Sequence, residues 1–150
     1  MVKPELAPFS HDAKDLVGTW TLVSVVAERD GKKFDSCGPN AKGLLVLDAN
    51  GRYSMILIAA GLPHFASGSR SNGTADENKA VVAGSIAHFG SYVVDEADKS
   101  LTLQIDRSTF PNWEGKHNKR SFVTIGDELV FREQHASAGG AATTIFKRAT

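Results

Sequence analysis

The sequence predicts an all-β fold and, within that class, an antiparallel barrel in preference to a sandwich, which remains the alternative. Three observations lead to this prediction. Short apolar or alternating segments recur along the 150 residues, Gly-containing turns separate them, and only one stretch has the signature of a helix. We expect strands at residues 15–28, 43–48, 52–60, 87–95, 100–107, 119–125, 128–133 and 141–148.

The first half of the chain carries the clearest hairpin signal. Asn50-Gly51 separates the apolar segments 43–48 and 52–60. Both residues of this dipeptide tolerate the positive φ that a tight hairpin turn requires. We therefore expect the two segments to pair, with Tyr53 and Met55 on one face of the second strand as core or cavity wall.

The single helix is predicted after a long loop. Residues 61–71 are rich in Gly, Pro and Ser and lack periodicity, which is typical of a loop at a rim. Thr74 and Glu77 have the spacing of a capping box, ahead of a helical run at 77–85. We expect segment 61–73 to be more mobile than the strands and to overhang the mouth of the barrel.

The strand at 87–95 carries two polar aromatic side chains of equal parity. His88 and Tyr92 are four residues apart, with Gly90 between them. Because alternate residues of a strand face the same way, both side chains are expected to point into the barrel. A glycine within a strand also predicts a bend or a close approach of another chain segment.

A sheet corner is predicted at residues 110–115, Phe-Pro-Asn-Trp-Glu-Gly. Pro111 ends the preceding strand because it lacks a backbone N–H, and Gly115 lets the chain reverse. At the mouth of a barrel, such a corner would bring Asn112 and Trp113 to a bound molecule. The alternative is that Trp113 packs on the corner as a hydrophobic latch.

Composition and charge argue against several classes of partner. Lys plus Arg and Asp plus Glu number 17 each, so neither nucleic acid nor an anionic membrane surface is expected. No apolar segment reaches the roughly 18–20 residues that span a bilayer. The sequence carries no signal for an oligomeric state.

The chain is expected to form one domain in a reducing compartment. Residues 1–14 are interpreted as a loose leader and not as a signal peptide, which leaves residues 15–150 as the domain. Cys37 is the only cysteine, so an internal disulfide and a thiolate zinc site are both excluded. A lone cysteine in a chain without a secretory signal favours the cytoplasm.

Motifs for metal, cofactor or covalent chemistry are absent from the sequence. The five histidines lack the His-x-His and His-Glu-x-x-His spacings, so no metal site is predicted. Gly-x-Ser-x-Gly is absent, and Gly139-Gly140 precedes a strand instead of a helix. A nucleophile elbow and a phosphate cradle are therefore not expected, and no cofactor is predicted.

A set of motifs points to a known family. Gly18-Thr19-Trp20 is similar to the lipocalin Gly-x-Trp motif, and Arg148 lies where the closing-strand arginine of that fold packs on the tryptophan. Further similarity lies at residues 50–54, 88–92, 109–115, 119–120 and 126–129. Over residues 15–148 the chain resembles the bacterial lipocalin-like domain family, a calycin-type group that is largely uncharacterised.

The resemblance implies an up-and-down, lipocalin-like antiparallel β-barrel of about eight strands. A barrel of that size either fills with side chains or holds one small ligand. It also implies that Trp20 and Arg148 meet at one end of the barrel. One departure concerns catalysis: this chain has Gln104-Ile105-Asp106 where the resembling sequences tend to have a histidine and a glutamate.

Three hypotheses for the function follow. The first is a protein that binds a small, mostly hydrophobic molecule, and its candidate ligand-binding residues are His88, Tyr92, Gln104, Asn112, Trp113, Arg120, Tyr53 and Met55. The second is an isomerase, cyclase or hydratase acting on a small hydrophobic substrate. The third is an interaction module with a filled barrel and an apolar outer patch.

The enzyme hypothesis assigns roles to three residues. His88 would act as acid or base, with Asp106 or Arg120 as its orienter or electrostatic stabiliser. We expect His88, Tyr92 and Arg120 to converge at the end of the barrel that holds Trp113. The same side chains could also form a satisfied polar network that closes the barrel, since buried polar groups are normally hydrogen-bonded.

Overall fold

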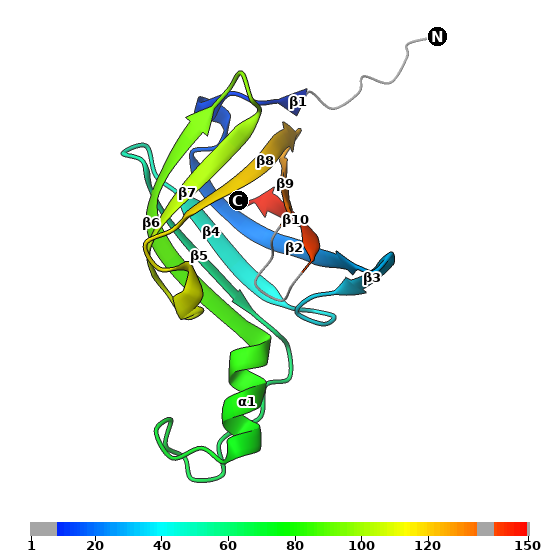
Figure 1. Ribbon diagram of the computed structural model, residues 1–150, viewed down its shortest axis with the longest axis vertical. Coiled ribbons are helices and arrows are strands. Elements are labelled where there is room, and N and C mark those ends of the chain that lie inside the picture. Colours follow the sequence, from blue (N-terminus) through cyan, green and yellow to red (C-terminus); the bar gives the residue numbers. More distant parts are fainter. Residues whose placement is uncertain (1–8, 135–139, 150) are drawn as a thin grey trace.

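The computed structural model describes residues 9–134 and 140–149 and forms a closed antiparallel barrel of eight strands (Figure 1). The barrel strands are β2 (Gly18–Arg29), β4 (Lys42–Leu47), β5 (Arg52–Ile58), β6 (Ser85–Asp95), β7 (Ser100–Ser108), β8 (His117–Ile125), β9 (Glu128–Glu133) and β10 (Ala141–Arg148). Neighbours in sequence pair from β4 to β10, β10 pairs with β2, and β2 pairs with β4. The ring therefore has no open edge, and the predicted fold class is confirmed.

The alternation seen in the sequence decides which side chains enter the barrel. In β5, Tyr53, Met55 and Leu57 are buried while the residues between them point outward. The same two-residue period buries Leu101, Leu103 and Ile105 in β7. Burial of these apolar side chains drives closure of the barrel, while β8 contributes mainly polar residues to the interior, Asn118, Arg120 and Thr124 beside Phe122.

Two short strands are added to the barrel and were not predicted. β1 (Phe9–Ser10) pairs with β8, and β3 (Lys32–Asp35) pairs with the C-terminal end of β2. A short 3-10 helix, η1 (Ala13–Asp15), follows β1. The predicted loose leader is thus structured from residue 9 onward, and its residues 1–8 lie outside the described part.

The predicted helix is present as α1 (Ala75–Gly84), two residues earlier than expected at its start. The Glu77 backbone N–H donates to the Thr74 hydroxyl, and the Glu77 carboxylate accepts from the Thr74 N–H, so the predicted capping box is confirmed. No helix in the described residues is long and apolar enough to cross a membrane.

The loop at 61–73 does not lie where the sequence suggested. Figure 1 shows α1 projecting away from the barrel, with the loop at its far end. Phe65 packs beside Gly73, and the Ala66 N–H donates to the Glu77 carboxylate, so the loop folds onto the helix. The expected overhang of the mouth is wrong because this capped helix carries the loop outward. Faster amide exchange in 61–73 than in residues 100–106 remains a prediction.

Trp20 and Arg148 close one end of the barrel, as predicted. The Arg148 guanidinium lies 4.2 Å from the centroid of the Trp20 ring, and the two residues are paired across β2 and β10. Arg148 also donates to the carbonyls of Val17 and Asp15, at 3.0 and 2.6 Å. The Trp20 indole N–H donates to the Leu16 carbonyl at 2.9 Å. We call this end the floor.

A β-bulge in β7 changes which side chains face inward. Gly90 pairs with Ile105 and Phe89 pairs with Arg107, so Asp106 is an extra residue opposite the β6 strand. The close approach predicted at Gly90 is confirmed, since a Cβ there would lie 1.9 Å from the Gln104 carbonyl oxygen. Asp106 alternates with the buried Ile105 and lies on the outer surface, and beyond it Arg107 is exposed as well.

The predicted corner forms a short 3-10 helix, η2 (Pro111–Trp113). Backbone hydrogen bonds from Ile105 to the Lys116 carbonyl and from Gly115 to the Ile105 carbonyl hold it against β7.

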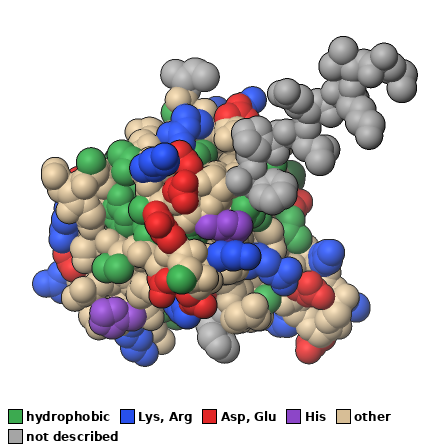
Figure 2. All heavy atoms as spheres, turned by 90° about the horizontal axis from the view of Figure 1, so that it is seen from above, with side chains coloured by type: hydrophobic (Ala, Val, Ile, Leu, Met, Phe, Trp, Pro, Cys, Tyr) green, Lys and Arg blue, Asp and Glu red, His purple; other side chains and the backbone are tan. Residues whose placement is uncertain are grey.

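Charged side chains of both signs are interspersed on the face of the molecule seen in Figure 2. This mixture agrees with the equal numbers of acidic and basic residues in the sequence.

Candidate functional site

A cluster of buried polar side chains lies inside the barrel at the end opposite the floor. Four strands contribute to it: β5 supplies Tyr53, β6 His88, β8 Asn118 and Arg120, and β9 Glu133. His88, Arg120 and Glu133 are only 3%, 4% and 7% exposed. We call these five residues the interior polar cluster. Such burial of polar groups requires that they satisfy one another.

Tyr53 fixes the orientation and the tautomer of His88. The phenol oxygen lies 2.8 Å from His88 Nδ1. Burial raises the pKa of Tyr53, so the phenol keeps its proton, and Nδ1 is its one partner among the described residues. We therefore assign the phenol as donor and Nδ1 as acceptor, which leaves the ring proton on Nε2.

His88 is neutral at physiological pH. Burial, assisted by the positive charge of Arg120, lowers its pKa to about 3. A neutral imidazole with its proton on Nε2 acts as a hydrogen-bond donor at that atom and carries no charge.

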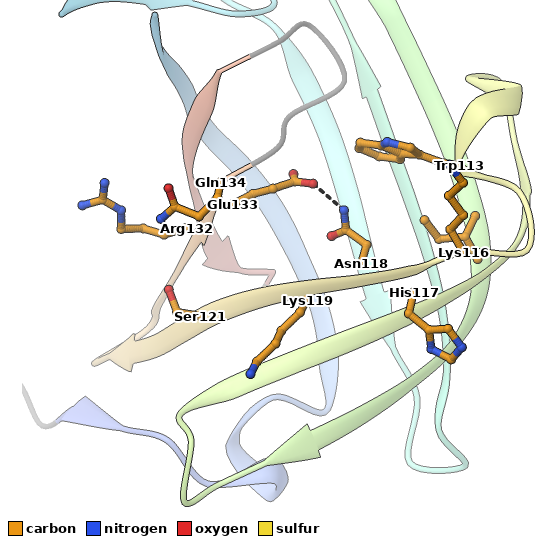
Figure 3. A pocket seen from close by; sticks show the side chains of 10 residues that line it. Trp113, Lys116, His117, Asn118, Lys119, Ser121, Arg132, Glu133 and Gln134 are labelled. Carbon is orange, nitrogen blue, oxygen red and sulfur yellow. Dashed lines mark hydrogen bonds between the residues drawn. The ribbon is translucent and has the colours of Figure 1, made fainter.

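Arg120 is held in place by Asn118 and Glu133. Its Nε donates to Asn118 Oδ1 at 2.7 Å, and its Nη2 lies 3.3 Å from Glu133 Oε2. The Asn118 amide in turn donates to Glu133 Oε1, the dashed bond in Figure 3. Burial lowers the pKa of Arg120 and Glu133 opposes that effect. The guanidinium stays charged, and Glu133 compensates the charge.

The corner places Trp113 against this cluster. The Trp113 ring lies 5.5 Å from the His88 ring, edge to face, and 5.7 Å from the Phe110 ring. Figure 3 shows Trp113 pointing from the corner toward the interior, on the side to which Asn118 and Glu133 also point. Trp113 is half-buried and packs on the core. It is therefore part of the wall around the cluster.

Three hollows meet around the cluster. An inner cavity of about 50 Å³ is lined by His88, Arg120, Trp113, Glu133 and Met55 among others. A larger hollow of about 430 Å³, which we call the mouth, shares Ser36, Cys37 and Ile86 with it and is otherwise walled by α1 and the corner. A side cleft of about 600 Å³ between β8 and the end of β9 shares Trp113 and Glu133 with the inner cavity (Figure 3).

Five of the residues predicted from the sequence are brought together. The inner cavity is lined by four of them, Met55, Trp113, His88 and Arg120. The fifth, Tyr53, is hydrogen-bonded to His88 Nδ1.

Tyr92 does not join them. Its hydroxyl donates to the Asp48 carbonyl at 2.5 Å, near the floor. The expected convergence of Tyr92 with His88 is wrong because four residues of a strand span about 13 Å, although they share a face.

Three other candidates lie on the outer surface. Gln104 and Asn112 are exposed. Asp106 is 41% exposed and forms an ion pair with Arg52 at 3.0 Å. The proposed pairing of His88 with Asp106 is therefore not formed, because Asp106 alternates with the buried Leu103 and Ile105 and so faces outward.

Sequence reasoning missed Asn118 and Glu133. Glu133 has the same parity in its strand as the buried residues Leu129 and Phe131, and Asn118 has the same parity as Arg120. An acidic residue at an inward position of a predicted strand was the available signal for Glu133. Among the described residues, no group of three or more His, Cys, Asp or Glu is arranged to hold a metal ion.

The outer surface of the barrel also carries apolar side chains. Leu44, Ile56 and Ile58 are 44–46% exposed and line a hollow of about 650 Å³ over β4 and β5. Such a surface was expected of an interaction module. That hypothesis also requires a filled barrel, whereas an inner cavity is present here.

Comparison with protein-family models shows the family of the chain. Residues 17–149 match the family model described as a lipocalin-like domain. No curated protein matches the chain. The matched region includes every barrel strand and all of the interior polar cluster.

Proposed function

Because the chain belongs to the lipocalin-like domain family, we propose that its barrel binds a small, mostly hydrophobic molecule. The apolar body of the ligand occupies the mouth and its polar end enters the inner cavity. The observation that carries this proposal is that the two hollows are adjacent, since three residues line both of them: Ser36, Cys37 and Ile86. An eight-stranded barrel has room for one such ligand.

The two hollows differ in chemistry in the way a binding site requires. Most of the lining of the mouth is apolar, from Val82, Ala83, Ile86, Phe110 and Pro111, and the rest comes from Ser36, Cys37, Ser85 and Thr109. The inner cavity instead presents His88, Arg120 and Glu133. Apolar walls supply affinity, and a few convergent polar groups fix the orientation of the ligand.

The inner cavity is too small to hold the whole ligand. About 50 Å³ of free space accommodates a few water molecules or one functional group. The roughly eightfold larger mouth, about 430 Å³, therefore takes the body of the ligand.

We also propose that the protein acts in the cytoplasm, because Cys37, a lone cysteine that lines both hollows, suits a reducing compartment.

An enzyme of the isomerase, cyclase or hydratase type is the second candidate. The observation that favours it is the pairing of a charged guanidinium with a neutral imidazole donor in a buried cavity. Such donors stabilise negative charge that develops on a substrate oxygen. Asp106 has no part in this version, and Glu133 is the carboxylate at the cavity.

The neutral fluorescent ketone prodan tests the binding proposal. Its emission, excited directly, reports transfer from water into an apolar site. Ile86→Trp puts a larger side chain at the position that lines both hollows and so reduces the space for the ligand. It is expected to weaken prodan binding about tenfold or more. Ile56→Trp, on the outer face of β5 at 44% exposure, is the matched control and should leave binding unchanged.

Equal prodan affinity in the two variants would remove the mouth as the binding site. The enzyme candidate would be favoured over a carrier if the wild type consumed an added ketone and His88→Phe abolished this turnover while still binding prodan. Prodan binding without turnover of any ketone tested favours the carrier.

A further inference from the structure

We propose that the inner cavity recognises an uncharged hydrogen-bond acceptor, the carbonyl oxygen of a ketone, ester or lactone, and rejects carboxylates. This inference rests on the proposed binding function and specifies the ligand class. It follows from which atoms of the interior polar cluster are already paired, and from the charge that the cluster carries.

His88 supplies the first donor. Its Nδ1 is occupied by the Tyr53 phenol at 2.8 Å, so its proton lies on Nε2. The hydrogen bond that His88 makes among the described residues is the one at Nδ1. Since no fully buried side-chain N or O atom there lacks a partner, Nε2 must be accessible from the inner cavity that His88 lines. An acceptor atom of a ligand would complete its hydrogen bonding.

Arg120 supplies further donors. A guanidinium has five N–H groups. Among the described residues, Nε has a hydrogen-bond acceptor in Asn118, and Nη2 has the Glu133 carboxylate as its ionic partner. The two N–H groups of Nη1 have no acceptor there, and the side chain lines the same cavity as His88.

Each carboxylate and amide oxygen of the cluster, by contrast, already has a partner within the cluster. Glu133 Oε1 accepts from Asn118 and Oε2 faces Arg120, while Asn118 Oδ1 accepts from Arg120 Nε. The other polar groups at the cavity are the hydroxyls of Ser36 and Thr144 and the Cys37 thiol. Each of these can donate or accept a hydrogen bond, so they favour neither donor nor acceptor ligands. A ligand that must donate a hydrogen bond therefore finds no free carboxylate or amide oxygen.

The charge balance excludes an anionic ligand. Arg120 and Glu133 cancel, and His88 is neutral, so the cavity has no net charge. A carboxylate entering it would bring one unit of negative charge into a buried site without a compensating cation. The loss of its hydration then outweighs its hydrogen bonds, whereas a carbonyl oxygen loses far less.

Three compounds with one aromatic ring and different polar ends provide the test: acetophenone, ethylbenzene and benzoate, each used to displace prodan from the wild-type protein. Acetophenone is expected to bind roughly tenfold or more tightly than ethylbenzene, because of a hydrogen bond to a charged donor. Benzoate is expected to bind more weakly than acetophenone. The infrared carbonyl stretch of bound acetophenone should lie below its frequency in hexane.

A charge substitution tests the second half of the inference. Glu133→Gln keeps the shape and the Asn118 hydrogen bond but leaves Arg120 uncompensated. The preference should reverse, with benzoate binding more tightly than acetophenone. If this variant does not fold, the three affinities and the infrared shift of the wild type still decide the matter.

The outcomes separate the two proposals. Equal displacement by acetophenone and ethylbenzene, or tightest binding by benzoate in the wild type, overturns the carbonyl inference and leaves the binding function intact. Failure of prodan and of all three compounds to bind overturns both.

Discussion

Neutral His88 makes the stability of the folded protein depend on pH. Its pKa of about 3 in the folded state is below the unfolded value of 6.5. Between these two values the unfolded chain binds more protons, so the stabilisation is complete above about pH 6.5 and is lost as the pH falls toward 3.

His88→Gln should remove this dependence. On going from about pH 7.5 to about pH 5, the wild type is expected to lose about 2 kcal/mol more of its unfolding free energy than the variant. Urea unfolding at the two pH values measures the difference. The carboxylates titrate equally in both proteins, so identical losses would mean that His88 is not held neutral by the fold.

Glu133 compensates a charge inside the barrel, which predicts a large cost when it is removed. Glu133→Leu strands the Arg120 guanidinium, which is 4% exposed, and should cost about 3–5 kcal/mol of unfolding free energy. Asp106→Ala is the control, since it breaks an ion pair whose partners are 53% and 41% exposed. It should cost less than about 1 kcal/mol.

The double variant Arg120→Met with Glu133→Leu should recover most of the lost stability, because both buried charges are gone. If Glu133→Leu proved as stable as Asp106→Ala, Glu133 would not be the compensating charge.

Single residues of the site could be predicted only where strand parity suffices. His88 was placed inside the barrel because it shares parity with Tyr92 on one strand, and Arg120 on the premise that the even positions of its strand point inward. Asp106 was proposed as a partner of His88 although it shares parity with Thr102 and Gln104, the polar face of β7, and it lies on the outer surface. The pairing of Arg120 with Glu133 depends on the register between β8 and β9, which sequence patterns do not specify.

At the scale of elements, the bulge between β6 and β7 depends on Gly90. Gly90→Ala would drive a Cβ to 1.9 Å from the Gln104 carbonyl oxygen, so the two strands must separate or the bulge must move. We expect a loss of about 1–3 kcal/mol or more, since the clash is with backbone.

Gly61→Ala is the control for Gly90→Ala. The φ of Gly61 is +72°, and nothing lies within 4 Å of the position that an alanine methyl group would take there, so only backbone strain of about 1–2 kcal/mol is added. Comparable stability of the Gly90→Ala protein and the wild type, by thermal unfolding, would contradict the packing assigned to the bulge.

Regular elements were predictable because their signals are local. The bounds of β9 and β10 agree with the prediction, and the capping box at Thr74 marked the helix start. β1 and β3 were missed because each is short and gains its stability from a partner strand distant in sequence or across a tight turn. The loop at 61–73 was placed wrongly since its position depends on the direction in which α1 leaves the barrel.

At the scale of the whole molecule, the two ends of the barrel have separate roles. The floor is closed by Trp20 and Arg148, whereas the mouth and the interior polar cluster lie at the other end. Trp20→Ala should therefore cost roughly 3–5 kcal/mol of unfolding free energy and leave prodan affinity unchanged. Unaltered urea unfolding, or a loss of prodan binding in protein that remains folded, would contradict this division.

Closure of the barrel was predictable from the resemblance, since Gly18-Thr19-Trp20 and Arg148 mark strands that meet. The existence of an inner cavity was not. It depends on how far the side chains of eight strands fill the interior, and on the direction in which Trp113 leaves its corner.

The two tryptophans provide the most direct test of binding at the mouth end. Trp113 lies against His88 at the inner cavity, and Trp20 is fully buried at the floor. In proton–nitrogen NMR spectra recorded during titration with acetophenone, the indole N–H resonance of Trp113 is expected to shift saturably while that of Trp20 stays fixed. A Trp113 resonance that does not move at saturation, or equal shifts of both, would contradict a ligand site at this end of the barrel.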